Sequence, residues 1–290
     1  MYFLGFGFII GTFLGSFAKA LADRSLKNQS FWGRSYCPRC KNTLPWYDLL
    51  PIFSYIVLGG KCRYCHKKIG IEYLLIEVSM GFLIGLLFWK FPVSTVFSIA
   101  DLLFNTFFIT VLVALLLTDL KKMLIPDRIV IPAIWISVIF IIFLTIIKVI
   151  FLYYSLNQTR VGQLLLPPHS DFFQKHSLMA AEPLLSGLLM GTVIAAFFLA
   201  LIAITKGQGM GGGDVKLGAF MGLTLGFPNS AVALVAAFLS GAILSLMLIF
   251  TGKKSLKSAV PFGPFLVFGS LVALFFGKEI INWYLGLSLN

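Results

Sequence analysis

Gly211-Gly212-Gly213-Asp214-Val215-Lys216 is the stretch around which this sequence is organised, and Asp119, 95 residues earlier, is the counterpart of Asp214. Both aspartates adjoin long apolar segments of the kind that cross membranes. A carboxylate at membrane depth is costly and is by default a candidate functional group. The two acids therefore predict a membrane protein with chemistry at the ends of its helices.

The composition around these acids is that of a polytopic membrane protein. Of the 290 residues, 59% are hydrophobic and 12% are charged, and the mean hydropathy is +0.95. A transmembrane helix needs about 20 apolar residues. Candidate segments lie at roughly 2–21, 72–90, 97–119, 128–153, 183–204, 214–227, 229–251 and 260–285. We predict an all-α fold of about eight transmembrane helices, in which the short sixth segment is either a span or a re-entrant helix.

The basic residues indicate the orientation of the chain. The first segment carries its positive charges after the apolar run, whereas a signal peptide carries them before it. We interpret this segment as a retained span with the N-terminus outside. Alternating the spans from there places 18 of the 23 basic residues in the cytoplasm, as the positive-inside rule requires. Because these charges are spread over short loops, they favour contact with a bilayer of anionic lipid, and nucleic-acid binding is not expected.

All four cysteines lie in the one sizeable hydrophilic region of the sequence. They form two C-x2-C pairs, Cys37 with Cys40 and Cys62 with Cys65, separated by 21 residues. This spacing is typical of a structural four-cysteine zinc site. Two disulfides and a redox role are the alternatives. A reducing cytosol and two adjacent C-x2-C pairs favour zinc.

The hydrophilic region divides the sequence into three predicted domains. These are a first transmembrane helix at 1–22, a cytosolic zinc-knuckle domain at 23–71 and a transmembrane aspartyl peptidase domain at 72–290. Within the second domain, we interpret the semi-polar stretch from Trp46 to Leu58 as an interfacial segment, because Trp and Tyr prefer the membrane surface.

Asp119 and Asp214 fall on the same predicted side, at the ends of the third and sixth segments. Asp119 closes a helix, where an acid opposes the macrodipole, so we assign it to chemistry. Asp127 follows Pro126 in the first turn of the next helix, where an acid is favourable, and we assign it to support. Two carboxylates brought together share a proton, so that one acts as general base on a water and the other polarises a carbonyl.

The glycines before Asp214 favour the same chemistry. Gly209, Gly211, Gly212 and Gly213 permit positive φ and let an extended substrate chain approach the carboxylates. The alternatives are a flexible cytosolic turn for the glycines and a plain N-cap role for Asp214.

Further motifs accompany the acids and the cysteines. They are Gly11-x-x-x-Gly15-Ser16-Phe17, Leu44-x-Trp46, Pro51-x-x-Ser54-Tyr55, Tyr73-x-x-x-Glu77, Asp119-x5-Ile125-Pro126-Asp127, Gly211-x-Gly213-Asp214-Val215-Lys216 and Pro261-Phe262-Gly263-Pro264. Together they resemble the type IV prepilin peptidase (leader peptidase/N-methyltransferase) family of GxGD-type intramembrane aspartyl proteases. The resemblance runs nearly the length of the chain.

The resemblance implies a multi-pass enzyme of the bacterial inner membrane with two activities. One removes the basic leader of prepilins or pseudopilins, the substrates of type IV pilus and type II secretion systems, on the cytoplasmic side. The other methylates the new N-terminal residue with S-adenosylmethionine. The catalytic aspartates of the family correspond to Asp119 and Asp214, with Gly211, Gly213 and Lys216 beside the second.

The methyl-donor contacts are expected near the cytosolic domain and Glu77. A Glu77 that snorkels to the membrane surface or pairs with a lysine is the alternative. The sequence departs from the family at Lys19, close to where an asparagine is usual, and in a longer outside loop at 154–182.

Two other classes of function use the same features. A proton- or cation-coupled transporter would also place acids such as Asp119 and Asp214 in a membrane. A non-enzymatic scaffold would use the cysteine domain to dock a pilus assembly.

Overall fold

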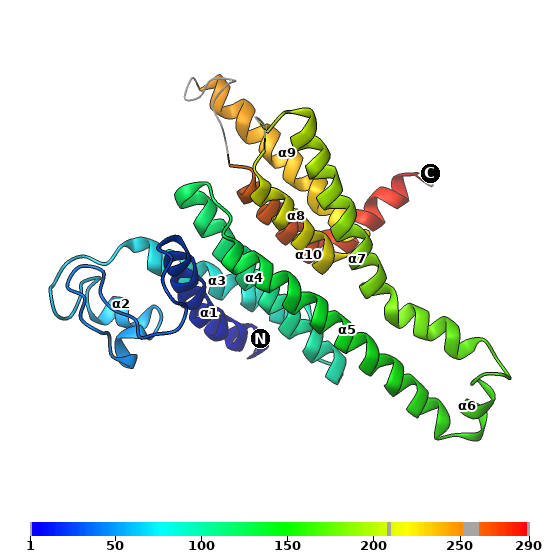
Figure 1. Ribbon diagram of the computed structural model, residues 1–290. Coiled ribbons are helices and arrows are strands. Elements are labelled where there is room, and N and C mark those ends of the chain that lie inside the picture. The colour runs from blue at the N-terminus through cyan, green and yellow to red at the C-terminus, as the bar shows by residue number, and fades with distance from the viewer. Residues whose placement is uncertain (1, 208–209, 252–260, 289–290) are drawn as a thin grey trace. The chain divides into compact units, whose positions relative to one another are not determined.

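A computed structural model describes residues 2–207, 210–251 and 261–288, which are mostly helical outside the loop at 27–70 (Figure 1). In these residues the only β structure is a pair of isolated bridges, Tyr36 with Thr43 and Lys61 with Lys68. The chain divides into two compact units, Met1–Ile129 and Val130–Asn290. The predicted all-α fold is therefore confirmed.

Three long helices form the first unit: α1 (Tyr2–Leu26), α3 (Ile71–Lys90) and α4 (Val96–Lys122). Helix α1 packs along α3, and α4 contacts both. Glycines bring the first two helices together, because a Cβ on Gly15 would lie 2.9 Å from the Cα of Glu77, and one on Gly11 would clash with the main chain of Met80. Small residues let helix backbones approach closely in membranes.

The cysteine loop, residues 27–70, connects α1 to α3 and contains a 3-10 helix, η1 (Trp46–Leu49), and a short helix, α2 (Phe53–Val57). A bidentate ion pair ties its two halves together. The Nε of Arg63 lies 3.1 Å from each carboxylate oxygen of Asp48, and its Nη2 lies 2.7 Å from Oδ1. Arg24 at the end of α1 donates to the carbonyls of Phe31 and Gly33, which fixes the start of the loop.

The second unit is built from the remaining helices. They are α5 (Asp127–Asn157, which begins at the end of the first unit), α6 (Arg160–Leu164), α7 (Phe172–Ile204), α8 (Gly212–Leu225), α9 (Asn229–Phe250) and α10 (Gly263–Ser288). Helix α8 contacts α7, α9 and α10. Its contact with α7 is again a glycine contact, because a Cβ on Gly222 would lie 2.7 Å from the carbonyl oxygen of Met190.

Seven helices of the described chain are long and apolar enough to cross a membrane. All eight predicted segments are helical, but α8 has only 14 residues and is about 21 Å long at 1.5 Å per residue. This is shorter than the roughly 30 Å hydrocarbon core of a bilayer. The sixth segment is thus a short helix among longer ones, with Asp214 in its first turn.

The expected long loop at 154–182 is mostly helical. Helix α5 continues to Asn157 and α7 begins at Phe172, so the helices extend well beyond the apolar segments that the sequence delimits. The reason is that a helix formed by its apolar residues can continue through the polar residues that follow or precede them, as α5 and α7 do here. Helix α7 also runs through Pro183, the residue at which the sequence predicts its start.

Replacing Gly11 tests the contact between α1 and α3. Gly11→Ala should lower the free energy of unfolding by about 1–3 kcal/mol, because its Cβ meets backbone atoms that have no room to move. Gly5→Ala on the same helix is the matched control, since a Cβ there meets nothing within 4 Å. Thermal unfolding in detergent, followed by circular dichroism, makes the comparison. Equal melting temperatures for the two variants would contradict the packing described.

Candidate functional site

The two C-x2-C pairs fold into matching turns. In the first, the N–H of Cys37 donates to the carbonyl of Asn42, and the N–H of Lys41 donates to the carbonyl of Cys37. In the second, Cys62, Lys67 and His66 repeat the same two hydrogen bonds. Lys41 and His66 both have positive φ, 60° and 51°. The spacing of the cysteines thus produces two equivalent knuckles.

The knuckles bring the four sulfur atoms together. All lie within 4.8 Å of one another, and the Sγ atoms of Cys37 and Cys65 are 3.9 Å apart. None of the four forms a disulfide. Four sulfurs around a zinc ion with bonds of about 2.3 Å would be about 3.8 Å apart. The predicted four-cysteine cluster therefore has the geometry of a metal site, and His66 lies outside it.

The thiols influence one another's ionisation. Burial by itself raises the pKa of Cys37, but backbone N–H groups of Cys40 and Arg39 and the neighbouring thiols outweigh it and lower this pKa to about 7. For Cys40 the backbone of Asn42 lowers the pKa, while burial and the three other cysteines raise it to about 11. One thiol of the cluster therefore ionises easily, and its negative charge makes it harder for the other thiols to ionise. A bound divalent cation would remove this repulsion between thiolates.

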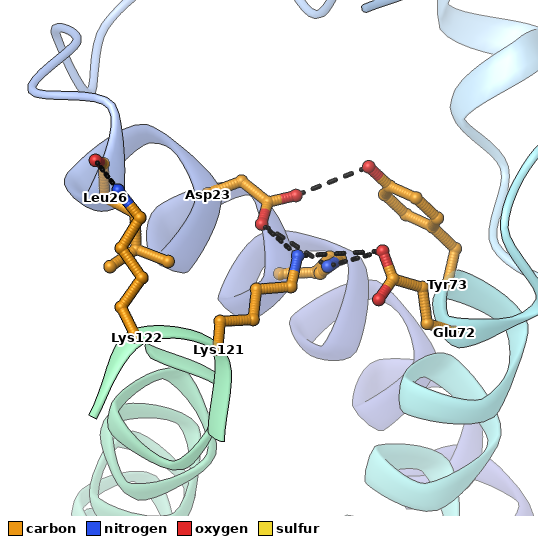
Figure 2. Close-up of polar contacts among 7 residues, drawn as sticks. Asp23, Leu26, Glu72, Tyr73, Lys121 and Lys122 are labelled. Carbon is orange, nitrogen blue, oxygen red and sulfur yellow. Dashed lines mark hydrogen bonds and ion pairs between the residues drawn. The ribbon is translucent and has the colours of Figure 1, made fainter. Parts of the chain in front are cut away.

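A charge cluster joins the three long helices of the first unit. The ammonium of Lys19, whose side chain is only 2% exposed, lies 3.3 Å from Asp23 and 3.0 Å from Glu72. Lys121 reaches the same two carboxylates, at 2.8 and 3.6 Å, and the hydroxyl of Tyr73 donates to Asp23 at 3.3 Å. Figure 2 shows the carboxylate of Asp23 between the side chains of Tyr73 and Lys121.

This cluster is a functional neighbourhood that the sequence analysis missed. Two cations and two anions balance one another, and the two carboxylates offset the cost of burying the ammonium of Lys19. The one local trace of the cluster in the sequence is that Lys19 and Asp23 are one turn apart on α1. Lys121 lies two residues after Asp119, so the cluster also holds the end of α4 that carries this acid.

Asp119 is buried in the last turn of α4, with 5% of its surface exposed. Its carbonyl accepts from the N–H of Met123 at 2.7 Å, and Met123 has the left-handed conformation that ends the helix. Asp127 opens α5 directly after Pro126 and is exposed, whereas Pro126 is buried. The local structure predicted for this segment is therefore present.

Asp214 lies in the first turn of α8, where its Oδ2 accepts from the N–H of Gly211 at 3.4 Å. Gly211 is the N-cap and has φ −90°. The positive φ expected in this run is wrong for Gly211, Gly212 and Gly213, since the last two already belong to the helix. The expected room for a substrate chain remains, because a Cβ on Gly211 or Gly212 would meet nothing within 4 Å.

Two further residues near Asp214 were predicted to belong to the site, Gly209 and Lys216. Lys216 is half-buried in α8. Gly209 falls outside the described residues. The four cysteines, predicted to form one site, lie together in the structure. The two aspartates belong to different units, Asp119 to the first and Asp214 to the second.

Glu77 is buried in α3 and faces the cysteine loop. Its Oε2 accepts from the N–H of Ile52 at 2.8 Å, and the hydroxyl of Ser16 also donates to it. Among the described residues it forms no ion pair with a lysine, so the lysine-paired alternative is wrong for this residue. The alternative in which Glu77 snorkels to the membrane surface stays a prediction.

Seven apolar helices, buried carboxylates and a four-cysteine cluster define a polytopic membrane protein with a cysteine-rich insertion between its first two long helices. Residues 106–246 match the type IV leader peptidase family, and residues 9–91 match the bacterial peptidase A24 N-terminal domain. The chain belongs to the type IV leader peptidase family and is therefore a peptidase. The family and the seven helices make it a multi-pass protein of the inner membrane.

Curated relatives cover nearly the whole chain. It is similar to a prepilin leader peptidase/N-methyltransferase of Bacillus subtilis (strain 168), with 30% identity over 98% of each chain. Proteins of the same name from Legionella pneumophila and Pseudomonas aeruginosa are 30% and 29% identical, over 90% and 87% of this chain and 78% and 74% of their own length. No solved structure matches the chain.

Replacing Lys19 tests the charge cluster. Lys19→Met should lower the free energy of unfolding by about 1–2 kcal/mol, because it leaves the half-buried carboxylate of Asp23 and the half-exposed carboxylate of Glu72 with a single cation. Lys122→Met is the matched control, since this exposed ammonium reaches only the carbonyl of Leu26, at 3.5 Å, and should change stability by no more than about 0.5 kcal/mol. Thermal unfolding measures both. A Lys19→Met variant as stable as the control would contradict the role assigned to the cluster.

Proposed function

We propose that this protein is a membrane-embedded aspartyl endopeptidase that removes the leader of type IV prepilins or pseudopilins at the cytoplasmic face. Asp119 and Asp214 are its catalytic pair. The observation that carries the proposal is the buried carboxylate of Asp119 in the last turn of an apolar helix, in a chain whose relatives are named prepilin leader peptidases. A helix gains nothing from an acid at this end.

The chemistry follows from bringing the two carboxylates together. Like charges a few ångströms apart do not both ionise, so the pair holds one proton between them. The ionised member takes a proton from the attacking water, and the protonated member donates a hydrogen bond to the carbonyl of the scissile peptide. The pH–rate profile should then be bell-shaped and should report the pair as a unit.

The neighbouring residues support this pair. The open space at Gly211 admits the extended main chain of a substrate, with Gly213 and Lys216 further along the same turn and helix. Asp127 opens the helix that follows the Asp119 segment. The domain from 72 to 290 thus carries the peptidase, after the span at 1–22 and the cysteine domain at 23–71.

The proposed orientation places the N-terminus outside and the cysteine domain, with both aspartates, on the cytoplasmic side of the inner membrane. The partners are the lipid bilayer and the prepilins of a type IV pilus or type II secretion system. Three apolar side chains of the cysteine loop support membrane contact: Trp46, Phe53 and Ile56 are 75%, 62% and 67% exposed. Apolar side chains of this kind suit the membrane interface.

Zinc is the proposed occupant of the cysteine cluster. The sulfur separations fit a tetrahedral ion, and four thiolate ligands leave no open position, as in structural sites. The ion would tie residues 37–40 to 62–65 and so fix the fold of a loop too small for a core of its own. We assign it no step in the peptidase reaction.

Methyl transfer to the new N-terminus is the second proposed activity, because the relatives are also named N-methyltransferases. S-adenosylmethionine would supply the methyl group. The first unit offers a buried carboxylate, Glu77, beside a cavity of about 420 Å³, within the 300–1,000 Å³ range of small-molecule pockets. This cavity fits a donor of that size, and Glu77 is the residue that we assign to its binding.

Replacing each aspartate tests the peptidase. Asp119→Asn and Asp214→Asn should each reduce kcat/KM for a synthetic prepilin by at least about a hundredfold, because each removes one half of the acid–base pair. Cleavage is measured with purified protein by mass spectrometry of the product. Asp101→Asn is the control, since it lies 18 residues before Asp119 on the same helix, about 27 Å away along its axis. Unchanged cleavage in both variants would overturn the assignment of Asp119 and Asp214 as the catalytic pair.

Metal analysis tests the cysteine site. Purified protein should carry one zinc ion per chain by plasma mass spectrometry, and Cys37→Ser or Cys62→Ser should lose it. His66→Asn should retain it, because His66 lies next to Cys65 but outside the cluster, and Asn tolerates its left-handed backbone. Protein without zinc, or zinc that depends on His66, would overturn the assignment.

A further inference from the structure

A cavity of about 420 Å³ lies where the end of α1, the cysteine loop and the start of α3 meet. Its wall combines the apolar side chains Leu44, Leu49 and Leu58 with the aromatic side chain of Tyr55. Six basic residues also line it: Arg24, Lys27, Arg39, Arg63, Lys67 and Lys68. The cavity thus offers apolar walls together with charged groups of both signs, as a site for a charged small molecule would. The whole cavity belongs to the first unit.

Four acids border the cavity, and they differ in how their charge is balanced. Asp23 and Glu72 share Lys19 and Lys121, and Asp48 pairs with Arg63 at 2.7 Å. Glu77 forms no ion pair with any described lysine or arginine.

The partners of Glu77 are neutral. They are the N–H of Ile52 and the hydroxyl of Ser16, and the residue is 8% exposed. A desolvated carboxylate without a cation is costly. The basic side chains that line the cavity form no ion pair with Glu77, so its carboxylate is open to a positive charge carried by a ligand.

The backbone around Glu77 is built to hold it in this position. Ile52 has φ 61°, a region that a β-branched residue rarely adopts and that costs of order 1–3 kcal/mol. This conformation presents its N–H to Glu77. The Cα of Glu77 also lies against Gly15 of α1, a close contact that holds this turn of α3 in place.

We propose that this cavity is the methyl-donor site and that Glu77 recognises the positive sulfonium of S-adenosylmethionine. The inference rests on the proposed methyltransferase activity and its pocket, and it goes further because it gives Glu77 the role of discriminating substrate from product. When the methyl group moves to the pilin amine, an N–C bond forms as the S–C bond breaks and the amine releases a proton. The sulfur is left as a neutral thioether.

This change of charge gives Glu77 a role in turnover. The carboxylate attracts the donor while the sulfur is positive and loses that attraction once the sulfur is neutral. The donor should therefore bind more tightly than S-adenosylhomocysteine, which has the same adenosine and amino-acid parts but no charge on sulfur.

Equilibrium dialysis of the full-length protein in detergent tests the proposal, with radiolabelled S-adenosylmethionine and S-adenosylhomocysteine as probes. Glu77→Gln should weaken binding of S-adenosylmethionine by about tenfold or more, as expected for a hydrogen-bonded charge, and should leave S-adenosylhomocysteine nearly unchanged. Ala20→Phe, which fills the cavity from α1, should weaken both ligands. Glu182→Gln, an exposed residue of α7, is the control and should change neither.

The outcomes separate this proposal from the proposed function. If the wild type binds the donor and neither Glu77→Gln nor Ala20→Phe weakens binding, the site is elsewhere and the inference fails, although methylation stands. If the wild type cleaves prepilin but binds no donor, the inference fails together with the methyltransferase. Zinc content and melting temperature report whether each variant folds. Should Glu77→Gln not fold, the response of both ligands to Ala20→Phe decides.

Discussion

Charge neutralisation inside an apolar helical protein is the constraint on which the rest of this structure depends. An ammonium or carboxylate taken out of water costs several kcal/mol unless another group shares its charge. The first unit meets this cost by placing Lys19 and Lys121 against Asp23 and Glu72. Since these side chains come from α1, α3 and α4, the ion pairs that neutralise them also fix where the three helices end. Asp119 lies two residues before Lys121, so its position depends on the same cluster.

Close packing of glycines makes this arrangement possible. Gly11 and Gly15 let α1 contact the backbone of α3, and this contact brings Ser16 to Glu77 and Lys19 to Glu72. The cysteine loop then covers the same end of the two helices, held by its knuckles and by the pair of Asp48 and Arg63. A cysteine cluster, a neutral charge cluster and a cavity bordered by Glu77 thus lie at the same end of the contact between α1 and α3. We propose that the peptidase and the methyl-donor site use different acids of this unit, Asp119 and Glu77.

Much of this was readable from the sequence, because its signals are local. Apolar runs predict helices, the C-x2-C spacing predicts adjacent sulfurs, and Pro126 with Asp127 predicts the start of α5. The charge cluster was not predicted, because it joins Lys19, Glu72 and Lys121 across 102 residues of chain, and no local pattern records such a contact. The helical ends of the 154–182 segment were missed because polarity was taken as the end of a helix. The isolation of Glu77 from cations is also visible only in three dimensions.

The central claim is that Asp119, at the end of α4, and Asp214, at the start of α8, act on one peptide bond. Cross-linking in native membranes tests it most directly. The double variant Asp119→Cys with Asp214→Cys is treated with a short bismaleimide, and the linked peptides are identified by mass spectrometry. Asp101→Cys with Asp214→Cys, at the opposite end of α4, is the reference pair. The account predicts a cross-link for the first pair and none for the reference; no cross-link between positions 119 and 214, with or without prepilin present, would contradict it.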